Sequence, residues 1–518
     1  MGGCEYPTSR FTGLSDIISQ SRQRRIRIIF LAATTIGAIV FGLYLVVIIG
    51  IGLVAARYQK TEADFWVAGR RFGLGVLVMA NMAAVMHGGA ILSGIAFAGQ
   101  FGGVAILPYI SFVGGAAIIF YLFAKKLRQS GGFTIPDYMG DRFDSRGLRA
   151  WSAIVVAVSS IIYLIAQLRG MAFILETLLG FDFMTSLALG TVIFVAYVAM
   201  GGLLAVVWTN IAQFIFMWVG LLILVPYVYD AVGGWSSVLQ QVEAVAPGWT
   251  SPTGTQWSGW YMVSWYLIWL VAYSTRLELV TKMYAARDDR IARASVPIAI
   301  GLVMIFLLYG NFYLGAAARV VVWDQLASPD QAFPVLVTLL LSPALAAIAL
   351  TGIASAAMST TDSLLLMSGS AIAHDLVRRC HDEPNGIQRE EKDYLRISRI
   401  SIVAVGAIAF VCAIPDLALI LRIVSYAIAI VGAAFFFPLL VGMTSRRVSR
   451  EAALASSIGG TLITCVWIFG ALTNTSWAGI VHPGIVGLAT SGLLMLAVTL
   501  FTPPVADEAI NKYFGEAK

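Results

Sequence analysis

Charged residues are scarce in this chain. Only 12% of its 518 residues are Asp, Glu, Lys or Arg, whereas 59% are hydrophobic. The longest polar stretches are residues 1–27, 125–149, 230–257 and 375–396, and none is long enough to bury a core of its own. The composition therefore excludes an appended kinase, nuclease or other soluble module.

Cysteine is also rare, and the sequence motifs typical of enzymes are missing. The four cysteines, Cys4, Cys380, Cys412 and Cys465, show no paired spacing, so they indicate neither a disulfide framework nor a zinc site. The sequence has no His-Glu metal motif and no nucleophile with a paired base. We therefore expect no enzyme activity and no resident cofactor.

Long apolar runs are abundant instead. Each is around 20 residues long, enough to cross a hydrocarbon core of roughly 30 Å. The runs are continuously apolar rather than alternating, which favours helices over a β-barrel. The sequence therefore predicts an all-α polytopic membrane protein with about thirteen transmembrane helices. The expected spans are residues 28–55, 74–100, 104–124, 150–178, 184–200, 206–229, 258–276, 295–318, 342–372, 397–414, 420–443, 452–473 and 482–502.

Lys and Arg gather in alternate loops, so the net charge of +6 indicates orientation in a membrane and no nucleic-acid partner. The basic loops lie around residues 57–71, 125–149, 276–293, 378–399 and 446–450, and the opposite loops carry only Arg319 and Arg422 beyond the amino-terminal tail. We therefore expect a multi-pass protein of the cell membrane with a cytoplasmic carboxyl terminus. Thirteen spans imply an amino terminus outside the cell, but five arginines before residue 28 argue against it. The side on which the amino terminus lies is therefore left undecided.

The span at residues 342–372 contains hydroxyl groups and a carboxylate. On a helix, Ala356, Ser359 and Thr360 lie at i, i+3 and i+4 and share one face, with Asp362 close to it. Oxygens without a fixed positive partner suit a small hard cation, and polar groups inside a membrane mark an ion or substrate path. The alternative is that these hydroxyls bond to their own helix or hold neighbouring helices together.

Two adjacent glycines lie in the middle of the span at residues 74–100, in the segment Met86-His87-Gly88-Gly89-Ala90. Glycine lowers the cost of leaving helical geometry and exposes backbone groups, although glycine pairs also serve close helix packing. His87 beside the pair is a candidate for binding substrate or carrying a proton. A neutral histidine bonded to a neighbouring helix is the alternative.

Four local patterns together resemble the sodium:solute symporter family, whose members carry proline, sugars, pantothenate and small monocarboxylates. The patterns are TEADFWVAGRRF at residues 61–72, FTIPDYMGDRF at 133–143, GGLLAVVWTNIAQ at 201–213 and AAMSTTDSLL at 356–365. The likeness extends from about residue 61 to residue 450.

The resemblance implies a leucine-transporter-like core of ten helices, built as a 5+5 inverted repeat from residues 74–229 and 258–443. One span precedes this core within residues 1–60, the core occupies 61–450, and two spans follow within 451–518. Such transporters bind ion and solute near the midplane, where the first helix of each repeat is broken. In the second repeat, which has no Gly or Pro there, we expect the irregular turn at residues 272–275.

By similarity to the family, five groups would bind sodium. They are the backbone carbonyls of Gly89, Leu92 and Ala356 and the hydroxyls of Ser359 and Thr360. Asn210 stands where several relatives have an aspartate linked to ion coupling, so Asn210 and Asp362 are the candidates for coupling.

His87, Arg169, Trp269 and Tyr273 are the candidates for binding substrate. A buried Arg169 would suit a carboxylate, although it could instead reach the outer membrane interface or pair with Glu176. Trp269 and Tyr273 belong to an aromatic run and lie deep in the span at residues 258–276.

The sequence therefore predicts sodium-coupled symport of a small polar organic solute across a lipid bilayer, with a carboxylate-bearing solute favoured. Proton coupling through His87 or Asp362 is the alternative within transport. A membrane sensor that binds solute without moving it is the alternative from another class. The substrate itself, the ion stoichiometry and the oligomeric state cannot be read from the sequence.

Overall fold

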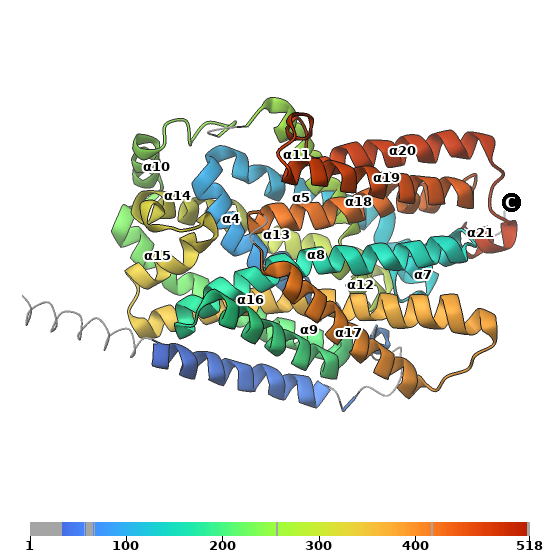
Figure 1. Ribbon diagram of the computed structural model, residues 1–518, viewed down its shortest axis with the longest axis horizontal. Coiled ribbons are helices and arrows are strands. Elements are labelled where there is room, and N and C mark those ends of the chain that lie inside the picture. The colour runs from blue at the N-terminus through green and yellow to red at the C-terminus, as the bar shows by residue number, and fades with distance from the viewer. Residues whose placement is uncertain are drawn as a thin grey trace, which may run out of the picture.

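The computed structural model describes residues 34–514, apart from residues 56, 59–65, 67, 255–256 and 416–417. Within this part the protein is a bundle of helices that run roughly along one long axis (Figure 1). α7, α21 and the carboxyl terminus lie at one end, and α10 lies at the other (Figure 1). The predictions for the amino-terminal tail, including Cys4, fall outside the described residues, as do the first five residues of the motif at 61–72.

The helices of the described residues are, in chain order, η2 (Ala68–Arg70), α3 (Leu74–Val85), α4 (Gly88–Phe101), η3 (Gly102–Ile106), α5 (Leu107–Ile118), η4 (Ile119–Phe123), α6 (Ala124–Ser130), α7 (Ile135–Arg142), α8 (Arg146–Leu179), α9 (Phe183–Val232), α10 (Trp235–Val245), α11 (Gly259–Thr275), α12 (Leu277–Tyr284), α13 (Asp289–Ile305), η5 (Phe306–Gly310), α14 (Asn311–Val321), η6 (Trp323–Gln325), η7 (Pro329–Gln331), α15 (Ala332–Leu340), α16 (Pro343–Ser370), η8 (Ala371–Asp382), η9 (Glu383–Asn385), α17 (Glu391–Ala413), α18 (Ile420–Thr444), α19 (Arg450–Leu472), η10 (Ser476–Gly479), α20 (Pro483–Phe501) and α21 (Asp507–Phe514). A further helix, Thr34–Ala55, precedes them.

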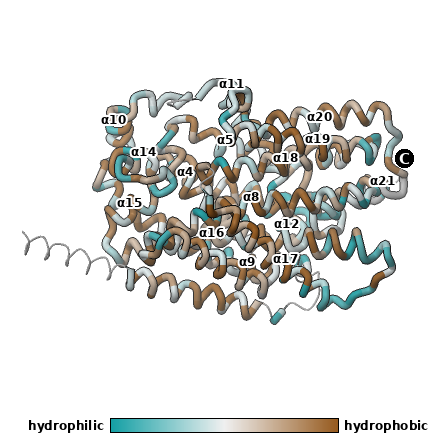
Figure 2. The backbone as a smooth tube through the Cα atoms, in the orientation of Figure 1, coloured by the Kyte–Doolittle hydropathy of each residue, from teal (hydrophilic) through white to brown (hydrophobic). Residues whose placement is uncertain are grey.

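Ten helical stretches of the described residues are long and apolar enough to cross a membrane. Hydrophobic residues cover the long helices, and hydrophilic residues concentrate towards the two ends of the bundle (Figure 2). Within the described residues, every predicted span coincides with helix, although the span at 74–100 is split into α3 and α4, and those at 184–200 and 206–229 meet in α9 at a kink. The predicted all-α polytopic architecture is confirmed, and the count of thirteen spans stays a prediction.

Two short helices lie in stretches that the sequence indicated only as polar loops. α7 begins where the Thr134 side chain accepts a hydrogen bond from the Asp137 amide, which caps the helix start. α10 lies on the opposite end of the bundle. The helix of α16 also continues as π-helical η8 to Asp382, well into the stretch predicted as loop. Hydropathy alone does not detect these elements because they are amphipathic and short.

α16 lies at the centre of the bundle and is buried almost along its whole length. It packs most extensively against α9 and also against α8 and α4. Gly352 of α16 and Gly220 of α9 allow α16 and α9 to approach closely, because a Cβ on Gly220 would lie 2.8 Å from the Ala349 carbonyl oxygen. The hydroxyl-bearing face of α16 is therefore held away from lipid.

Two helices are interrupted in the interior of the bundle. α3 and α4 are separated at Met86 and His87, within the segment predicted from its glycines. α11 and α12 are separated at Arg276, whose φ of −56° and ψ of 122° are not helical. The predicted turn at residues 272–275 is wrong by one residue or more, because α11 stays helical as far as Thr275. No Gly or Pro marks this second break, and the bonds of the Arg276 side chain hold it instead.

Candidate functional site

The first break leaves backbone carbonyls of α3 without helical partners. The last carbonyls of any helix lack an amide four residues on, and here the chain leaves helical geometry at Met86 and His87. His87 then caps α4, because its Nδ1 accepts a hydrogen bond of 3.1 Å from the Ala90 amide. The break thus has a carbonyl end on α3 and an amide end on α4, and a cation suits the carbonyl end.

The hydroxyl face of α16 meets this carbonyl end. The Ser359 hydroxyl is shared between two carbonyl oxygens, that of Ala83 on α3 at 3.2 Å and that of Ala356 on its own helix at 2.9 Å. The Thr360 hydroxyl is fully buried and has no hydrogen-bond partner among the described residues. An orphaned buried hydroxyl is costly, so Thr360, the residue after Ser359, is a candidate ligand.

Gly88 allows the close approach of α4 to α16 at this place. A Cβ on Gly88 would lie 2.8 Å from the Cβ and 2.9 Å from the Cα of Ala357. No side chain fits between the two helices there. The glycine pair therefore serves both the break and the packing, which the sequence left as alternatives.

Gly89 and Leu92 do not present their carbonyls at the break. Both lie inside α4, where each carbonyl accepts a hydrogen bond from the amide four residues on. The assignment of these two carbonyls to sodium, made by resemblance, is therefore not kept in the proposal below. Ala83 and Met86 have the same i, i+3 spacing and lie at the carbonyl end, with Met86 in non-helical geometry (φ −89°, ψ 54°).

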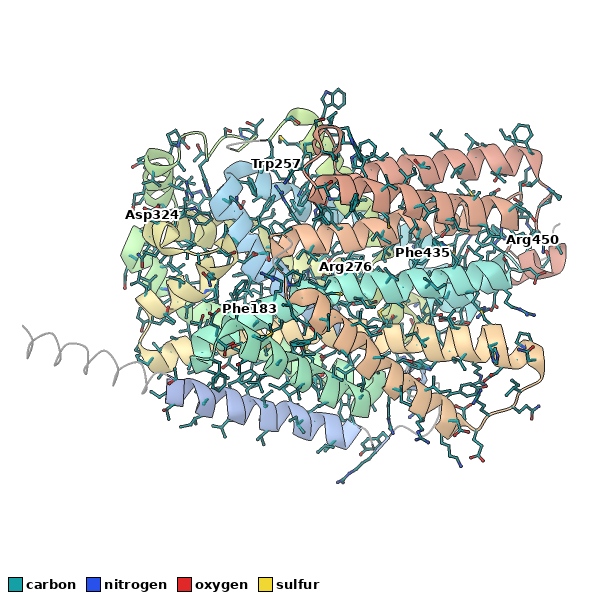
Figure 3. The ribbon with its side chains drawn as sticks, viewed as in Figure 1. Phe183, Trp257, Arg276, Asp324, Phe435 and Arg450 are labelled. Atoms are coloured by element: carbon teal, nitrogen blue, oxygen red, sulfur yellow. The ribbon has the colours of Figure 1, made fainter. Side chains whose placement is uncertain are left out.

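A chain of hydrogen bonds links the two breaks. Tyr163 of α8 lies between them, with its hydroxyl 3.1 Å from His87 Nε2 and 3.1 Å from Arg276 Nη2. Because His87 Nδ1 accepts from an amide, the neutral ring carries its proton on Nε2 and donates to Tyr163. Arg276 also donates to the Ala84 carbonyl at 3.3 Å and is paired with Glu278. Arg276 lies near the middle of the bundle (Figure 3).

Asp362 of α16 meets Gln213 of α9 at the interface between these two helices. The Oδ2 of Asp362 is 3.5 Å from Gln213 Nε2, and no Lys or Arg among the described residues forms an ion pair with it. The amide of Asn210, one turn from Gln213 on α9, is buried with no partner among the described residues.

The four predicted substrate residues fall in different places. The centre of the Tyr273 ring lies 5.2 Å from the guanidinium carbon of Arg276. Trp269 lies one turn before Tyr273 on α11. His87 caps α4. Arg169 is bonded elsewhere, because its Nη1 donates to the carbonyls of Ala413 and Pro415 at the end of α17.

Comparison with known proteins identifies the family. Residues 65–460 match the model of the sodium:solute symporter family. The chain belongs to this family. It is a sodium-coupled symporter of a small solute and not an enzyme.

Characterised relatives of this symporter align over nearly its whole length. The sodium/proline symporter of Haemophilus influenzae is 26% identical over 92% of this chain and 96% of its own. The sodium/pantothenate symporter of Escherichia coli is 26% identical over 90% of this chain and 97% of its own. A solved structure of a Na⁺-coupled sialic acid symporter, 17% identical, superposes with a TM-score of 0.75 over 91% of this chain and 99% of that one. This likeness shows the fold.

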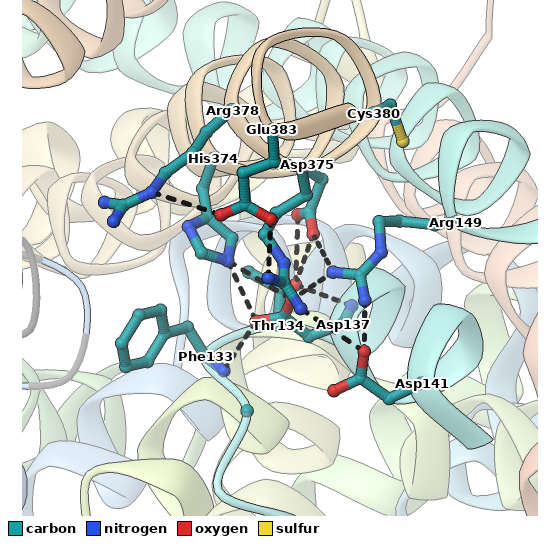
Figure 4. Close-up of polar contacts among 12 residues, drawn as sticks. Phe133, Thr134, Asp137, Asp141, Arg149, His374, Asp375, Arg378, Cys380 and Glu383 are labelled. Carbon is teal, nitrogen blue, oxygen red and sulfur yellow. Dashed lines mark hydrogen bonds and ion pairs between the residues drawn. The ribbon is translucent and has the colours of Figure 1, made fainter. Parts of the chain in front are cut away.

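A cluster of charged residues closes one end of the symporter, where α7 meets α8 and η8 (Figure 4). Arg149 forms ion pairs with Asp137 and Asp141, and His374 Nε2 lies 3.0 Å from Asp137. Asp375 accepts a hydrogen bond of 3.0 Å from the Thr134 hydroxyl. Asp137, His374 and Asp375 are close enough to hold a metal ion, but the guanidinium of Arg149 already supplies positive charge there.

The neighbours of Asp137 decide its charge. Burial alone would raise the pKa of Asp137, but the nearby His374 and Arg149 outweigh it and hold this pKa well below its usual range. Asp137 is therefore ionised at neutral pH. The motif FTIPDYMGDRF was noted from the sequence only as part of the family likeness. It supplies the Thr134 cap of α7, the Asp137 carboxylate and Gly140. Gly140 leaves room for Arg149, because a Cβ on Gly140 would lie 2.4 Å from Arg149 Nε.

Sequence reasoning missed Ala83, Tyr163, Arg276 and Glu278. Arg276 was counted with the basic residues of a cytoplasmic loop, yet it is 2% exposed. The available signal was an Arg-Leu-Glu triplet in an apolar context, at the end of the helix that the family resemblance expects to be broken.

Proposed function

We propose that this symporter binds sodium between the carbonyl end of α3 and the hydroxyl face of α16. The ligands are the carbonyls of Ala83, Met86 and Ala356 and the hydroxyls of Ser359 and Thr360. The observation that carries the proposal is the 3.2 Å contact between Ser359 Oγ and the Ala83 carbonyl, beside the orphaned Thr360 hydroxyl. Five neutral oxygens suit a small hard cation, which prefers oxygen ligands.

Sodium at this place joins two elements that must move relative to each other. One ligand group belongs to the interrupted helix and the other to α16, so the ion favours the arrangement in which both are in contact. Its release on the inner side lets the helices rock around the site. Each positive charge that crosses contributes about 2.3 kcal/mol per 100 mV, which supplies the work of concentrating the solute.

The proposed organisation follows from the positions of the two breaks. The α3–α4 break opens the first repeat, residues 74–229, and the α11–α12 break opens the second, residues 258–443, within a core of residues 61–450. Residues 1–60 and 451–518 add spans on either side. The end of the bundle with α7, α21 and the carboxyl terminus carries the Lys- and Arg-rich segments, which supports a cytoplasmic carboxyl terminus.

Trp269 and Tyr273 are proposed to line the solute path beside the second break. Arg169 is left out of the proposed site, because its guanidinium holds the end of α17. His87 takes a positioning role, since both ring nitrogens are bonded, one to the Ala90 amide and one to Tyr163.

A second candidate function is proton-coupled symport, and Asp362 is the observation that favours it. This carboxylate is fully buried, and its Oδ1 has no hydrogen-bond partner among the described residues. Such a group can carry a proton as well as support a cation. His87 is the weaker carrier, because a second proton on the ring would displace the Ala90 amide from Nδ1.

Uptake into proteoliposomes separates the two ions. Radiolabelled L-proline, pantothenate, lactate, acetate and glucose are tested with an inward sodium gradient, and again with choline replacing sodium at the same pH. We expect at least one of these solutes to accumulate in sodium only. Undiminished accumulation in choline that collapses with a protonophore would establish proton coupling instead.

A further inference from the structure

We infer that Arg276 binds a carboxylate group of the transported solute, which makes the substrate class small organic carboxylates. The inference rests on the proposed function, because it places the solute beside the second helix break. Arg276 is the residue of that break, it is 2% exposed, and its Nη1 has no hydrogen-bond partner among the described residues. An unused donor on a buried guanidinium is costly unless a ligand takes it.

The guanidinium borders a small internal cavity. Arg276, Glu278, Tyr163 and Ala272 line one small cavity between α8, α11 and α18. Leu277, the next residue along the chain, lines both this cavity and a second one that extends towards α7. Leu277 thus lies between the cavity at Arg276 and a cavity on the side of the charged cluster.

The bonds that Arg276 already makes leave one side of its planar fork open. Nε, at 2.6 Å, and Nη2 both donate to a single oxygen of Glu278. Nη2 also reaches the Ala84 carbonyl and Tyr163. Nη1 is left for an incoming oxygen. A planar guanidinium suits carboxylates because it offers parallel donors.

Tyr163 supplies a second donor in the same cavity. Its oxygen accepts from His87 Nε2–H and from Arg276 Nη2, so its own hydrogen is not used by either contact. A solute carboxylate can therefore accept from Arg276 Nη1 with one oxygen and from Tyr163 with the other. Both donors are held by bonds that exist before the solute arrives, which reduces the ordering cost of binding.

The charges at the junction favour an anion. Arg276 and the buried Lys282 carry two positive charges and Glu278 one negative charge, while His87 is neutral. One excess positive charge remains among these groups, and a monoanion balances it. The Ala84 carbonyl bonds Arg276, and the adjacent Ala83 carbonyl belongs to the proposed sodium site. Cation and carboxylate thus bind next to each other and strengthen each other's binding.

The experiment measures ligand-induced thermal stabilisation of the full-length purified protein. The probes are propionate, lactate and L-proline, each with its amide (propionamide, lactamide and L-prolinamide), titrated in sodium and in choline at pH 7. We expect at least one carboxylate to stabilise the wild type in sodium and its amide to fail.

The decisive variant is the double substitution Arg276→Gln with Glu278→Gln. It removes both charges of the ion pair together, so neither Arg276 nor Glu278 is left without its partner. We expect the variant to keep the stabilisation by sodium alone and to lose carboxylate affinity by about 30-fold or more, the usual weight of a charge-assisted contact. Arg276→Lys, which keeps the ion pair but lacks the fork, should lose an intermediate amount. Arg293→Gln, on the half-buried arginine that bonds the Phe120 carbonyl, is the matched control and should bind as the wild type does.

The outcomes separate the inference from the proposed function. Unchanged carboxylate affinity in the double variant overturns the inference, as does a wild type that no carboxylate of the panel stabilises or that binds the amides equally well. Absence of any stabilisation by sodium alone contradicts the proposed sodium site instead.

Discussion

Removal of a single hydroxyl, that of Thr360, tests the proposed sodium site. The Thr360 side chain is buried and unbonded among the described residues, whereas the neighbouring Thr361 donates to the Ala357 carbonyl of its own helix at 2.8 Å. We expect Thr360→Ala to lower the apparent sodium affinity by about 10- to 100-fold, because a ligand to a charged group is lost. The measurement is the sodium dependence of uptake or of thermal stability.

Thr361→Ala is the matched control for this experiment. It removes the same hydroxyl and methyl groups from the next residue, whose hydroxyl donates to the Ala357 carbonyl of its own helix. We expect it to leave the sodium affinity within about twofold, since such local hydroxyl bonds contribute little to a site on the other face. Equal losses in the two variants would show that Thr360 acts only in packing.

Asp362 carries the second prediction at this scale. We expect Asp362→Asn to keep sodium-dependent solute exchange but to lose gradient-driven accumulation, because an amide cannot supply charge to a coupled cation. One coupled charge at 100 mV corresponds to about 2.3 kcal/mol, so accumulation should fall about 50-fold. Proteoliposome accumulation and counterflow, measured side by side, distinguish the two activities. Accumulation at the wild-type level would remove Asp362 from coupling.

Individual site residues were predictable from the sequence where a pattern defines them. Ser359 and Thr360 share a helical face by spacing alone, and the structure directs Ser359 towards the interrupted helix. The carbonyl ligands were expected at Gly89 and Leu92, whereas the proposal places them at Ala83 and Met86, because the glycines mark a break without telling which side of it offers oxygens. Arg276 was misread since its burial depends on α8 and α3, which are distant in sequence.

At the scale of elements, the contact between α4 and α16 depends on Gly88. We expect Gly88→Ala to cost about 1–3 kcal/mol of stability, because the new Cβ meets the backbone of Ala357, which cannot move aside as a flexible side chain can. Sodium affinity should fall with it, since Ser359 and Thr360 are displaced from the carbonyl end of α3. Thermal unfolding with and without sodium measures both effects.

Gly75→Ala is the control for Gly88→Ala. Gly75 lies in α3 with nothing within 4 Å of its would-be Cβ. Alanine there should be neutral or stabilising by about 0.5–1 kcal/mol, because it reduces the freedom of the unfolded chain. A Gly88→Ala protein as stable and as sodium-responsive as Gly75→Ala would show that α4 and α16 can separate without cost.

The elements were largely predictable because hydropathy and length determine membrane helices. The break between α3 and α4 followed from the glycine pair. The break between α11 and α12 was misplaced, because it is imposed by the bonds of Arg276 to Glu278, Tyr163 and Ala84 rather than by local propensity. α7 and α10 were missed because they lie outside the apolar runs. α7 is fixed by its Thr134 cap and by packing on α8, and α10 by packing on α14.

At the scale of the whole molecule, the two breaks and the charged cluster belong to one arrangement. α16 bears the hydroxyls of the proposed sodium site, and its continuation η8 bears His374 and Asp375, which meet α7 and Arg149. We therefore expect that opening this end of the bundle separates the α7–η8 contact. Because the proposed sodium site and this contact lie on one continuous helix, we expect movement at one to be transmitted to the other.

Asp137 provides the pH test of this closure. Its pKa is lowered in the folded protein, so its ionised form stabilises the fold above the ordinary aspartate value of about 3.9, and this contribution is lost as the pH falls below that value. We expect the wild-type melting temperature to fall between pH 5 and pH 3. Asp137→Asn should melt several degrees lower at pH 7, because Arg149 loses a buried partner. It should also fall less towards pH 3, since the titrating group is gone. Asp230→Asn, at an exposed position of α9, should keep the wild-type profile. Parallel pH profiles for Asp137→Asn and the wild type would show that the closure does not depend on this carboxylate.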